Sequence, residues 1–261
     1  MRMKMKNKNT LFVGLLCILL SACSTTKNLP EGEILYTGID KLEVVNEDKT
    51  LAGITALTEV EAALAYAPNN AILGSSSLRW PIPFGLWVYN GFEKYQDKKG
   101  VGRWIFDHLG KSPVLMSSVN GETRAKVATN LLRDYGYFNG SVSYQEVPQK
   151  NPKEAKVSYV IDMAQPYFLD SIAYLRYPHY ADSLIRSTHS QSVLKNGENF
   201  SVLKLEEERQ RLSSLFRNHG YYYYRPEFTT YRADTLQKPG YVSLQVVPRN
   251  GVPTEARKQY Y

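Results

Sequence analysis

The sequence predicts an α+β protein built from two tandem copies of one unit, each ordered strand, helix, helix, strand, strand. Two observations lead to this fold class. The segment Leu131–Phe138, LLRDYGYF, recurs 84 residues later as Leu215–Tyr222, LFRNHGYY, and such a fixed offset marks an internal repeat. In both copies an amphipathic helical pattern ends at a glycine, Gly136 or Gly220, and an aromatic-rich segment follows at once. We therefore expect two small domains within the 261 residues.

The N-terminus has the pattern of a bacterial lipoprotein signal. An apolar run at residues 11–20 follows a basic start and is too short to span a bilayer as a mature helix. It ends in Leu20-Ser21-Ala22-Cys23, which resembles a lipobox. We therefore expect residues 1–22 to be removed and Cys23 to carry the lipid; a plain signal peptide with an incidental cysteine is the alternative. Ser24, in place of an aspartate, favours delivery to the outer membrane, and the loss of Cys17 with the signal would leave no disulfide.

The charge of the chain argues against nucleic-acid binding. The formal net charge is +7, and removing the four positive charges of the first ten residues lowers it to +3, an ordinary charge for solubility. Tyrosine is abundant, with 20 residues. Its ring offers apolar area with a polar tip, which suits contacts with a protein partner or with carbohydrate.

The first domain is expected at residues 34–165, after a polar tether at residues 23–33. A capping-box pattern at Thr58–Glu61 predicts the start of a helix that Pro68 ends. Gly136 is expected to end the second helix in a left-handed conformation, which costs little only for glycine. The expected elements are a strand at 34–45, helices at 58–67 and 118–135, and strands at 137–147 and 156–163.

Residues 69–112 depart from the repeat and form an insertion. All three tryptophans, Trp80, Trp87 and Trp104, lie within it. The segment Arg79–Trp87 is too apolar for a solvated loop and too rich in proline for a central strand or an uninterrupted helix. Two interpretations remain. The insertion packs as a cover on its own domain, or it exposes an apolar patch to a partner or to lipid headgroups.

The second domain is expected at residues 166–250, and residues 251–261 would begin a further segment. Glu207 and Arg211 have the i, i+4 spacing of an ion pair on its second helix. Pro226 falls inside the next expected strand, and a proline cannot donate to a sheet ladder, so we expect this strand at the edge of its sheet. An open edge can accept a strand from another chain. The expected elements are strands at 168–175, 221–231 and 241–247 and helices at 182–192 and 202–219.

We find no set of residues that indicates catalysis. The histidines lack the spacing of a metal site, and neither a Gly-x-Ser-x-Gly elbow nor a phosphate-binding glycine loop occurs. The three consecutive glutamates Glu206–Glu208 have the helical spacing of a solvated face rather than of an acid pair. We therefore expect no enzyme activity, no metal and no cofactor.

The element order, with a Gly-Tyr-Phe or Gly-Tyr-Tyr junction after the second helix, resembles the POTRA domain, the periplasmic module of the BamA/TamA superfamily. Within it the chain is most similar to TamL, the lipoprotein form of TamA in Bacteroidota. The motifs that carry this resemblance are Pro68-Asn69-Asn70, Ile72-Leu73-Gly74, Leu86–Asn90, Gly110–Leu115, Glu208-Arg209, Arg217–Tyr222 and Ala233-Asp234-Thr235. The resemblance implies two tandem POTRA-like domains, each a three-stranded mixed sheet covered by two helices. The membrane barrel of the superfamily is absent from this sequence, so we expect a truncated chain or an arm that works with a separate barrel.

We expect a lipid-anchored, periplasm-facing arm of an outer-membrane protein assembly or translocation system. Nascent outer-membrane proteins or a TamB-like protein would add strands to its sheet edges. The expected edges are the strand at 221–231 and, second, the strand at 137–147. The candidate partner-binding residues are Tyr222, Tyr224, Glu227, Phe228 and Tyr231 on the first and Val142 and Tyr144 on the second.

The alternative is an outer-membrane lipoprotein that binds glycan or another ligand through its Trp/Tyr-rich insertion. This hypothesis predicts a concave pocket around Trp80, Trp87 and Trp104. The arm hypothesis predicts that the same rings pack on their own domain.

Overall fold

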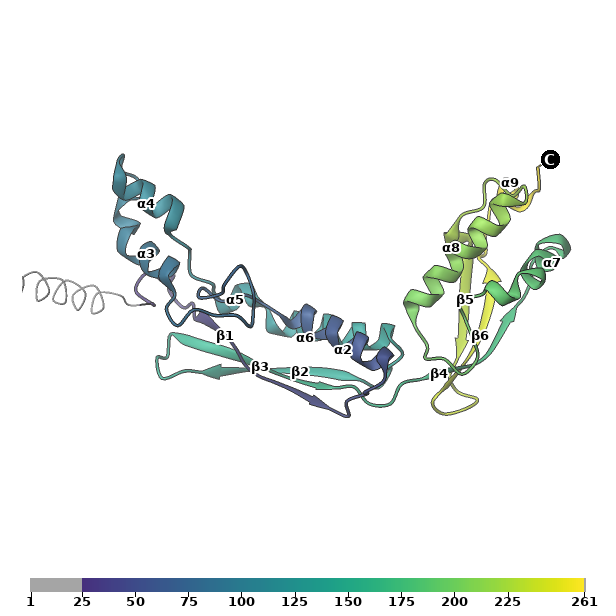
Figure 1. The fold of residues 1–261 in the computed structure, drawn as a ribbon, viewed down its shortest axis with the longest axis horizontal. Coiled ribbons are helices and arrows are strands. Elements are labelled where there is room, and N and C mark those ends of the chain that lie inside the picture. The colour runs from purple at the N-terminus through teal and green to yellow at the C-terminus, as the bar shows by residue number, and fades with distance from the viewer. Residues whose placement is uncertain (1–24, 261) are drawn as a thin grey trace, which may run out of the picture. The chain divides into compact units, whose positions relative to one another are not determined.

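The computed structural model describes residues 25–260, which form an α+β fold with two three-stranded sheets (Figure 1). The strand orders are β1-β3-β2 and β4-β6-β5. Along the chain each sheet receives one strand, then helices, then two strands, which confirms the predicted fold class. The strands are β1 (Leu35–Val45), β2 (Ser141–Pro148), β3 (Glu154–Asp162), β4 (Phe168–Tyr174), β5 (Thr229–Asp234) and β6 (Tyr241–Pro248). The helices are α2 (Leu51–Leu64), α3 (Phe84–Phe92), α4 (Val101–Leu109), α5 (Met116–Val119), α6 (Gly121–Asp134), α7 (His179–Ser187), α8 (Val202–Asn218) and α9 (Thr254–Arg257).

The first sheet is mixed. The Leu35 amide donates to the Lys153 carbonyl at 2.8 Å, and the Met163 amide donates to the Val45 carbonyl at 3.1 Å. Because the residue numbers rise together, β1 and β3 run parallel. β2 and β3 are consecutive strands joined by the short turn at residues 149–153, so their pairing is antiparallel.

The second sheet is mixed in the same way. Its central strand β6 pairs in parallel with β4, starting with Phe168 opposite Tyr241. On its other side β6 pairs antiparallel with β5, starting with Thr229 opposite Pro248. In both sheets, therefore, the last of the three strands along the chain lies in the centre and the other two lie at the edges.

The chain divides into two compact units. Among the described residues, unit 1 comprises 25–43, 64–125 and 143–160, and unit 2 comprises 44–63, 126–142 and 161–260. This division passes through the strands of the first sheet. The domain boundary expected at residue 165 therefore stays a prediction.

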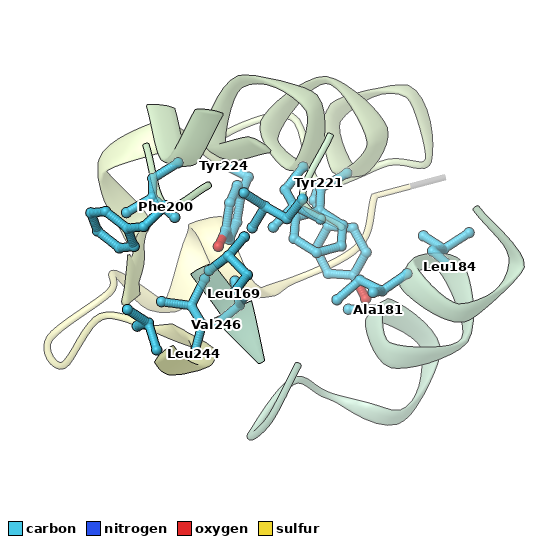
Figure 2. Packing of buried hydrophobic residues seen from close by; sticks show 14 residues of the cluster. Leu169, Ala181, Leu184, Phe200, Tyr221, Tyr224, Leu244 and Val246 are labelled. Carbon is cyan, nitrogen blue, oxygen red and sulfur yellow. The ribbon is translucent and has the colours of Figure 1, made fainter. Parts of the chain in front are cut away.

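Unit 2 contains an apolar core between the second sheet and the helices α7 and α8 (Figure 2). Alternate residues of β6, Val242, Leu244 and Val246, are buried, as expected for a strand with one inward face. From α8, Leu212 and Phe216 fall on one helical face and are 0% and 1% exposed.

Helix α2 begins earlier than the capping-box pattern predicts. The Thr50 hydroxyl accepts a hydrogen bond from the Gly53 amide at 3.1 Å, and the Asp48 carboxylate accepts one from the Thr50 amide at 2.9 Å. Thr58 lies inside the helix, where its hydroxyl donates to the Ile54 carbonyl at 2.8 Å. The predicted capping box is therefore wrong, because Thr58 bonds to the preceding turn and Thr50 satisfies the free amide at the helix start.

Both repeat junctions contain the expected left-handed glycine. The φ angle is +91° at Gly136 and +93° at Gly220. A turn follows each glycine, and β2 and β5 begin several residues further on. The strand starts predicted at Tyr137 and Tyr221 are therefore wrong. Both tyrosines are buried, at 0% and 5% exposed, so their rings fill the core before the strand begins.

Pro226 lies ahead of β5, not within it. It opens the 3-10 helix Pro226–Phe228, where its fixed φ and missing amide hydrogen are tolerated at the first position. β5 is nevertheless an edge strand of its sheet, as predicted. The expected position was right, and the reason given for it was wrong.

The insertion folds into α3, the 3-10 helix Glu93–Tyr95 and α4 (Figure 1). The Phe106 ring of α4 lies 5.2 Å from the Tyr89 ring of α3. A Cβ added at Gly102 would lie 2.8 Å from the Tyr95 ring, so this glycine permits the close approach of α4. No residue of α4 is buried.

The first described residues are bonded to unit 1. The Asn90 side chain on α3 donates to the Thr25 carbonyl at 3.2 Å, and the Asn28 side chain donates to the Asn90 carbonyl at 3.3 Å. The Thr25 hydroxyl donates to the Glu154 carboxylate. The predicted signal peptide, Cys17 and Cys23 lie outside the described residues. Within residues 25–260, no helix has the length and apolar character needed to cross a membrane.

Candidate functional site

The two sheets have four edge strands, β1 and β2 in the first and β4 and β5 in the second. An edge can accept a further strand only if its outward backbone groups are accessible. The edges differ in this respect. Other parts of the chain bond to the first residues of β1 and β4, whereas β5 and β2 keep outward backbone groups that no further strand of residues 25–260 pairs with.

The chain covers the edge of β1. The Tyr36 amide donates to the Val114 carbonyl at 2.8 Å. Further along, the Arg79 guanidinium donates to the Thr37 and Ile39 carbonyls at 3.4 and 3.3 Å. Gly38 lies between them with φ of +119°, and a Cβ there would lie 2.2 Å from the guanidinium. This glycine therefore makes room for Arg79 against the strand.

The chain also covers the start of β4. The Leu169 amide donates to the Glu198 carbonyl at 2.8 Å, and the Gly197 amide donates to the Leu169 carbonyl at 2.7 Å. At Tyr167, the residue before β4, the backbone carbonyl accepts a hydrogen bond from the Phe200 amide at 2.8 Å. The segment leading into α8 thus runs along the strand and occupies the groups that an added strand would need.

The edge of β5 is open. The Phe228 carbonyl accepts a hydrogen bond from the Arg249 amide at 2.7 Å. In an antiparallel ladder the N–H and the C=O of every second residue bond to the neighbouring strand. This bond therefore determines which residues of β5 bond to β6. In this register the backbone groups of Thr229, Tyr231 and Ala233 point away from β6. The Thr229 amide is bonded to the Pro226 carbonyl. No other strand of residues 25–260 pairs with β5, so Tyr231 and Ala233 offer both an N–H and a C=O.

The edge of β2 is open in the same sense. The Gln149 amide donates to the Glu154 carbonyl at 2.9 Å across the turn, and an antiparallel ladder continued from that bond points the backbone groups of Tyr144 and Glu146 away from β3. The Val142 amide also faces outward and donates to the Thr129 hydroxyl at 2.9 Å. The side chains of β2 are largely exposed except Val142.

The structure separates the predicted partner-binding residues into two groups. Tyr231, Val142 and Tyr144 lie on the open edge strands. The other four precede β5: Tyr222 lies in a turn, Tyr224 in an irregular segment, and Glu227 and Phe228 in the 3-10 helix. Their placement on a strand was wrong. Tyr224 is buried, and its ring lies 4.7 Å from the Phe216 ring in a T-shaped contact, whereas Tyr222 is 60% exposed.

The Tyr231 side chain is committed to α8. Its hydroxyl donates to the Leu205 carbonyl at 2.6 Å, and the Arg209 guanidinium lies 5.1 Å from the ring centroid. Burial, and then the charge of Glu208, raise the pKa of this tyrosine. A partner at β5 would therefore meet the backbone of Tyr231 rather than its ring. Sequence reasoning missed Ala233 and Glu146, since an outward backbone group is revealed by the register and not by the side-chain type.

Glu208 is buried, which corrects the expectation of a solvated face. Its carboxylate accepts from the Tyr174 hydroxyl at 2.6 Å, the Val193 amide at 3.2 Å and the Arg211 guanidinium at 2.6 and 2.9 Å. Arg211 therefore pairs at i, i+3 with Glu208, and the predicted pair with Glu207 is wrong. Burial, then the hydrogen bond to Glu208, raise the pKa of Tyr174. All carboxylate oxygens are used internally, so this group ties α8 to β4.

A second surface of interest lies on the insertion. A pocket of about 690 Å³ is lined by Trp80, Ile82, Phe84, Trp87, His108 and Leu109, among others. Trp80, Phe84 and Trp104 are 62%, 63% and 55% exposed. The Trp104 ring stacks on His108 at 4.9 Å, so α4 continues the pocket outward. We call Trp80, Ile82, Phe84, Trp104, His108 and Leu109 the tryptophan surface.

The tryptophan surface corrects one expectation of the arm hypothesis. Leu86 and Val88 of α3 are buried, but the rings of Trp80 and Trp104 do not pack as a cover. Two polar residues at the pocket are already bonded internally: Asn69 donates to the Ser112 carbonyl at 2.7 Å and accepts from the Val114 amide at 2.7 Å. Asn70 donates to the Trp80 carbonyl at 2.8 Å.

No group of three or more histidine, cysteine, aspartate or glutamate side chains that could hold a metal ion occurs within residues 25–260. The polar clusters described above consist of internal hydrogen bonds and ion pairs. The chemistry that the candidate site can offer is therefore backbone hydrogen bonding at β5 and β2 and apolar contact at the tryptophan surface.

No family model and no curated protein matches the chain. Similar solved structures include POTRA domains 3–5 of BamA from Haemophilus influenzae, at 10% identity and a TM-score of 0.33, with 85% of this chain and 100% of that one covered. The N-terminal domain of Omp85 from Thermosynechococcus elongatus is 14% identical with a TM-score of 0.32, covering 83% of this chain and 63% of that one.

POTRA domains 1–3 of the periplasmic domain of Omp85 from Anabaena are 13% identical with a TM-score of 0.34, and the alignment covers 83% of this chain and 62% of that one. The chain spans less than two thirds of both Omp85 structures. At these scores the likeness establishes neither the family nor the function of this chain.

Proposed function

We propose that this chain is a tandem POTRA-type arm of an outer-membrane protein assembly or translocation system, and that it engages its partners by strand addition at β5 and β2. One observation carries the proposal: the chain bonds to the first residues of β1 and β4 with its own backbone or with Arg79, whereas Tyr231 and Ala233 on β5 and Tyr144 and Glu146 on β2 keep outward backbone groups that no other strand of residues 25–260 pairs with. Main-chain hydrogen bonds at such edges give affinity for many sequences, which suits an arm that handles varied clients.

The element order supports the POTRA-type assignment. Each sheet is mixed, has its last strand in the centre and follows the order strand, helices, strand, strand. The motifs that resemble TamL add the proposal that the chain belongs with the lipoprotein form, anchored through Cys23 to the outer membrane and facing the periplasm. Nascent outer-membrane proteins, a TamB-like protein and a membrane barrel are the partners we propose.

Glycan binding by the insertion has less support. That hypothesis predicts a pocket around Trp80, Trp87 and Trp104, and the pocket is lined by Trp80 and Trp87 but not by Trp104. Glycan recognition also needs polar groups that can bond to sugar hydroxyls, and Asn69 and Asn70 are already bonded to backbone groups. Titration with oligosaccharides, read by tryptophan fluorescence, tests this hypothesis directly.

A single proline tests strand addition at β5. The Ala233 N–H points away from β6, so Ala233→Pro removes an outward donor and leaves the bonds between β5 and β6 in place. The matched control Ala233→Ser changes the side chain and keeps the amide. The probe is a fluorescent peptide of about ten residues that alternates apolar and polar side chains, as a barrel strand does.

We expect Ala233→Pro to weaken peptide binding at β5 at least tenfold and to leave binding at β2 unchanged, because one lost hydrogen bond and the blocking ring together exceed about 1.4 kcal/mol. Ala233→Ser should leave both within about twofold. Circular dichroism verifies that both variants fold. A folded Ala233→Pro variant that binds as tightly as the unaltered chain would exclude β5 as the site.

A further inference from the structure

The tryptophan surface includes one exposed face of the short amphipathic helix α4. At 100° per residue, Val101, Trp104 and His108 of α4 fall on one side, and Gly102 and Phe106 fall on the side that contacts the rest of the insertion. Val101 is 74% and Trp104 55% exposed. A helix normally turns its apolar face inward, so this outward orientation indicates a surface that meets something apolar.

Charge around the surface favours an anionic, apolar partner. Residues 69–112 contain six lysines and arginines against three acids; Arg79 is bonded to β1, and Arg103 is paired with Asp107 at 3.2 Å, which leaves four lysines against two acids. Lys111 lines the pocket itself. Exposed tryptophans with basic residues around them are typical of a protein surface at a membrane interface, where the ring lies at the level of the headgroups.

The start of the described chain is bonded to the same insertion. The Thr25 carbonyl accepts from the Asn90 side chain on α3, and Asn90 is 8% exposed. Cys23 precedes Thr25 by two residues, a reach of at most about 7 Å. Phe84 lies six residues from Asn90 on the same helix, which is about 9 Å along the helix axis. A lipid on Cys23 would therefore hold the tryptophan surface close to the bilayer.

We propose that the tryptophan surface contacts the interfacial region of the membrane to which the chain is anchored, with Trp80 and Trp104 inserted at headgroup level. This inference rests on the lipid anchor of the proposed function. It adds a second membrane contact to that anchor. It also gives the insertion a role separate from the sheet edges: it fixes unit 1 at the membrane surface.

The chain provides a convenient optical test, because its three tryptophans all lie in the insertion. A chain that begins at Cys23 contains every described residue and a single cysteine. It is coupled through that thiol to a maleimide lipid in vesicles that contain phosphatidylglycerol. The chemical anchor makes the result independent of whether cells lipidate Cys23, and the experiment does not involve the strand edges.

Three variants, each with two Trp→Phe substitutions, retain only Trp80, only Trp87 or only Trp104. We expect lipids brominated near the headgroup to quench at least half of the emission of Trp80 and of Trp104. The half-buried Trp87 is expected to be quenched less and is the internal control. Circular dichroism establishes that each variant folds.

Two outcomes overturn the proposal. In one, brominated lipid leaves Trp80 and Trp104 unquenched while aqueous acrylamide quenches both. In the other, brominated lipid does not quench the fluorescence of Trp80 and Trp104, and their emission maxima shift to the blue when a membrane-barrel protein is added. The tryptophan surface would then be a protein-binding surface.

Discussion

The two copies of the repeat have the same backbone junction but place opposite charges at an equivalent position in the second helix. In both, a left-handed glycine ends the helix and its carbonyl accepts an amide from a later segment at 2.9 Å: Tyr167 bonds to Gly136, and Tyr260 bonds to Gly220. The junction glycines therefore serve two purposes. They end a helix, and they let a following segment approach the backbone closely.

The equivalent position in the helix is occupied by Arg124 in the first copy and by Glu208 in the second. Arg124 donates to the Val119 and Ala65 carbonyls at 2.9 and 3.2 Å and lies 4.6 Å from the Tyr66 ring centroid. Glu208 accepts from four donor atoms in the core of unit 2. The repeat therefore preserves backbone geometry, while each copy satisfies its inward polar residue in its own way.

The largest effect should follow from breaking the network of Glu208. Glu208→Ala leaves Arg211, whose side chain is only 15% exposed, without its partner. We expect a loss of about 3–5 kcal/mol in the free energy of unfolding, the range for removing one member of a buried ion pair. Urea unfolding measures it.

The control for this prediction is Glu206→Ala on the same helix. Glu206 pairs with Arg209 at 3.1 Å, but its side chain is 49% exposed, so we expect a change of at most about 0.5 kcal/mol. Equal losses for the two variants would show that the buried network contributes nothing beyond a surface pair.

The second effect compares the two junction glycines. Alanine in a left-handed conformation costs about 1–2 kcal/mol at either position. A Cβ at Gly136 would also lie 2.7 Å from the carbonyl oxygen of Phe200, which is 6% exposed and held in the core. A Cβ at Gly220 would lie 2.6 Å from the carbonyl oxygen of Tyr260. Since Tyr260 is 37% exposed and can move more easily, we expect Gly136→Ala to be more destabilising, by roughly 1 kcal/mol.

Thermal unfolding of both variants measures that difference. A larger loss for Gly220→Ala would mean that the segment at Tyr260 is held more rigidly than the segment at Phe200.

The third effect concerns Tyr137, the first tyrosine after Gly136. Its hydroxyl donates to Asp48 at 2.6 Å. Burial opposes ionisation of Asp48, but the hydrogen bonds from Tyr137 and Thr50 prevail and lower its pKa. A carboxyl with a lower pKa in the folded state contributes stability above its unfolded-state pKa and loses it as the pH falls through the folded value.

We expect Tyr137→Phe to cost about 1–2 kcal/mol at pH 7, and progressively less as the pH falls below about 4, the ordinary pKa of an unfolded aspartate, and through the lower folded-state pKa of Asp48. Urea unfolding at several pH values measures this trend. Asp48→Asn is the matched variant, because it removes the titrating group and should make the penalty of Tyr137→Phe independent of pH. A penalty that stays constant in the unaltered background would contradict the assigned hydrogen bond.

The sequence was most informative where a local rule decides the structure. Gly136 and Gly220 adopt positive φ as expected, and the helix predicted at 202–219 is α8, with Ser201 accepting from the Lys204 amide at its start. The sequence pattern gave a wrong prediction where tertiary packing decides the structure. The aromatic run after Gly220 has the composition of a strand, but Tyr221 and Tyr224 turn into the core, so β5 starts at Thr229.

The open and covered edges could not be read from the sequence, because they depend on contacts between distant segments. Arg79 covers β1 from 42 residues away in the chain. The one local signal was Gly38, since a glycine inside a strand indicates close approach of another group. The exposure of Trp80 and Trp104 likewise depends on how α4 packs, which composition alone does not determine.

The central claim is that partners add to the edges that follow the two junctions, and amide hydrogen exchange tests it most directly. The alternating peptide described above is added to the folded chain, and exchange is read residue by residue by NMR. We predict new protection at the outward amides of Tyr231 and Ala233 on β5 and of Tyr144 and Glu146 on β2. Peptide binding that protects β1, β4 or the insertion instead, and leaves these four amides unchanged, would contradict the account.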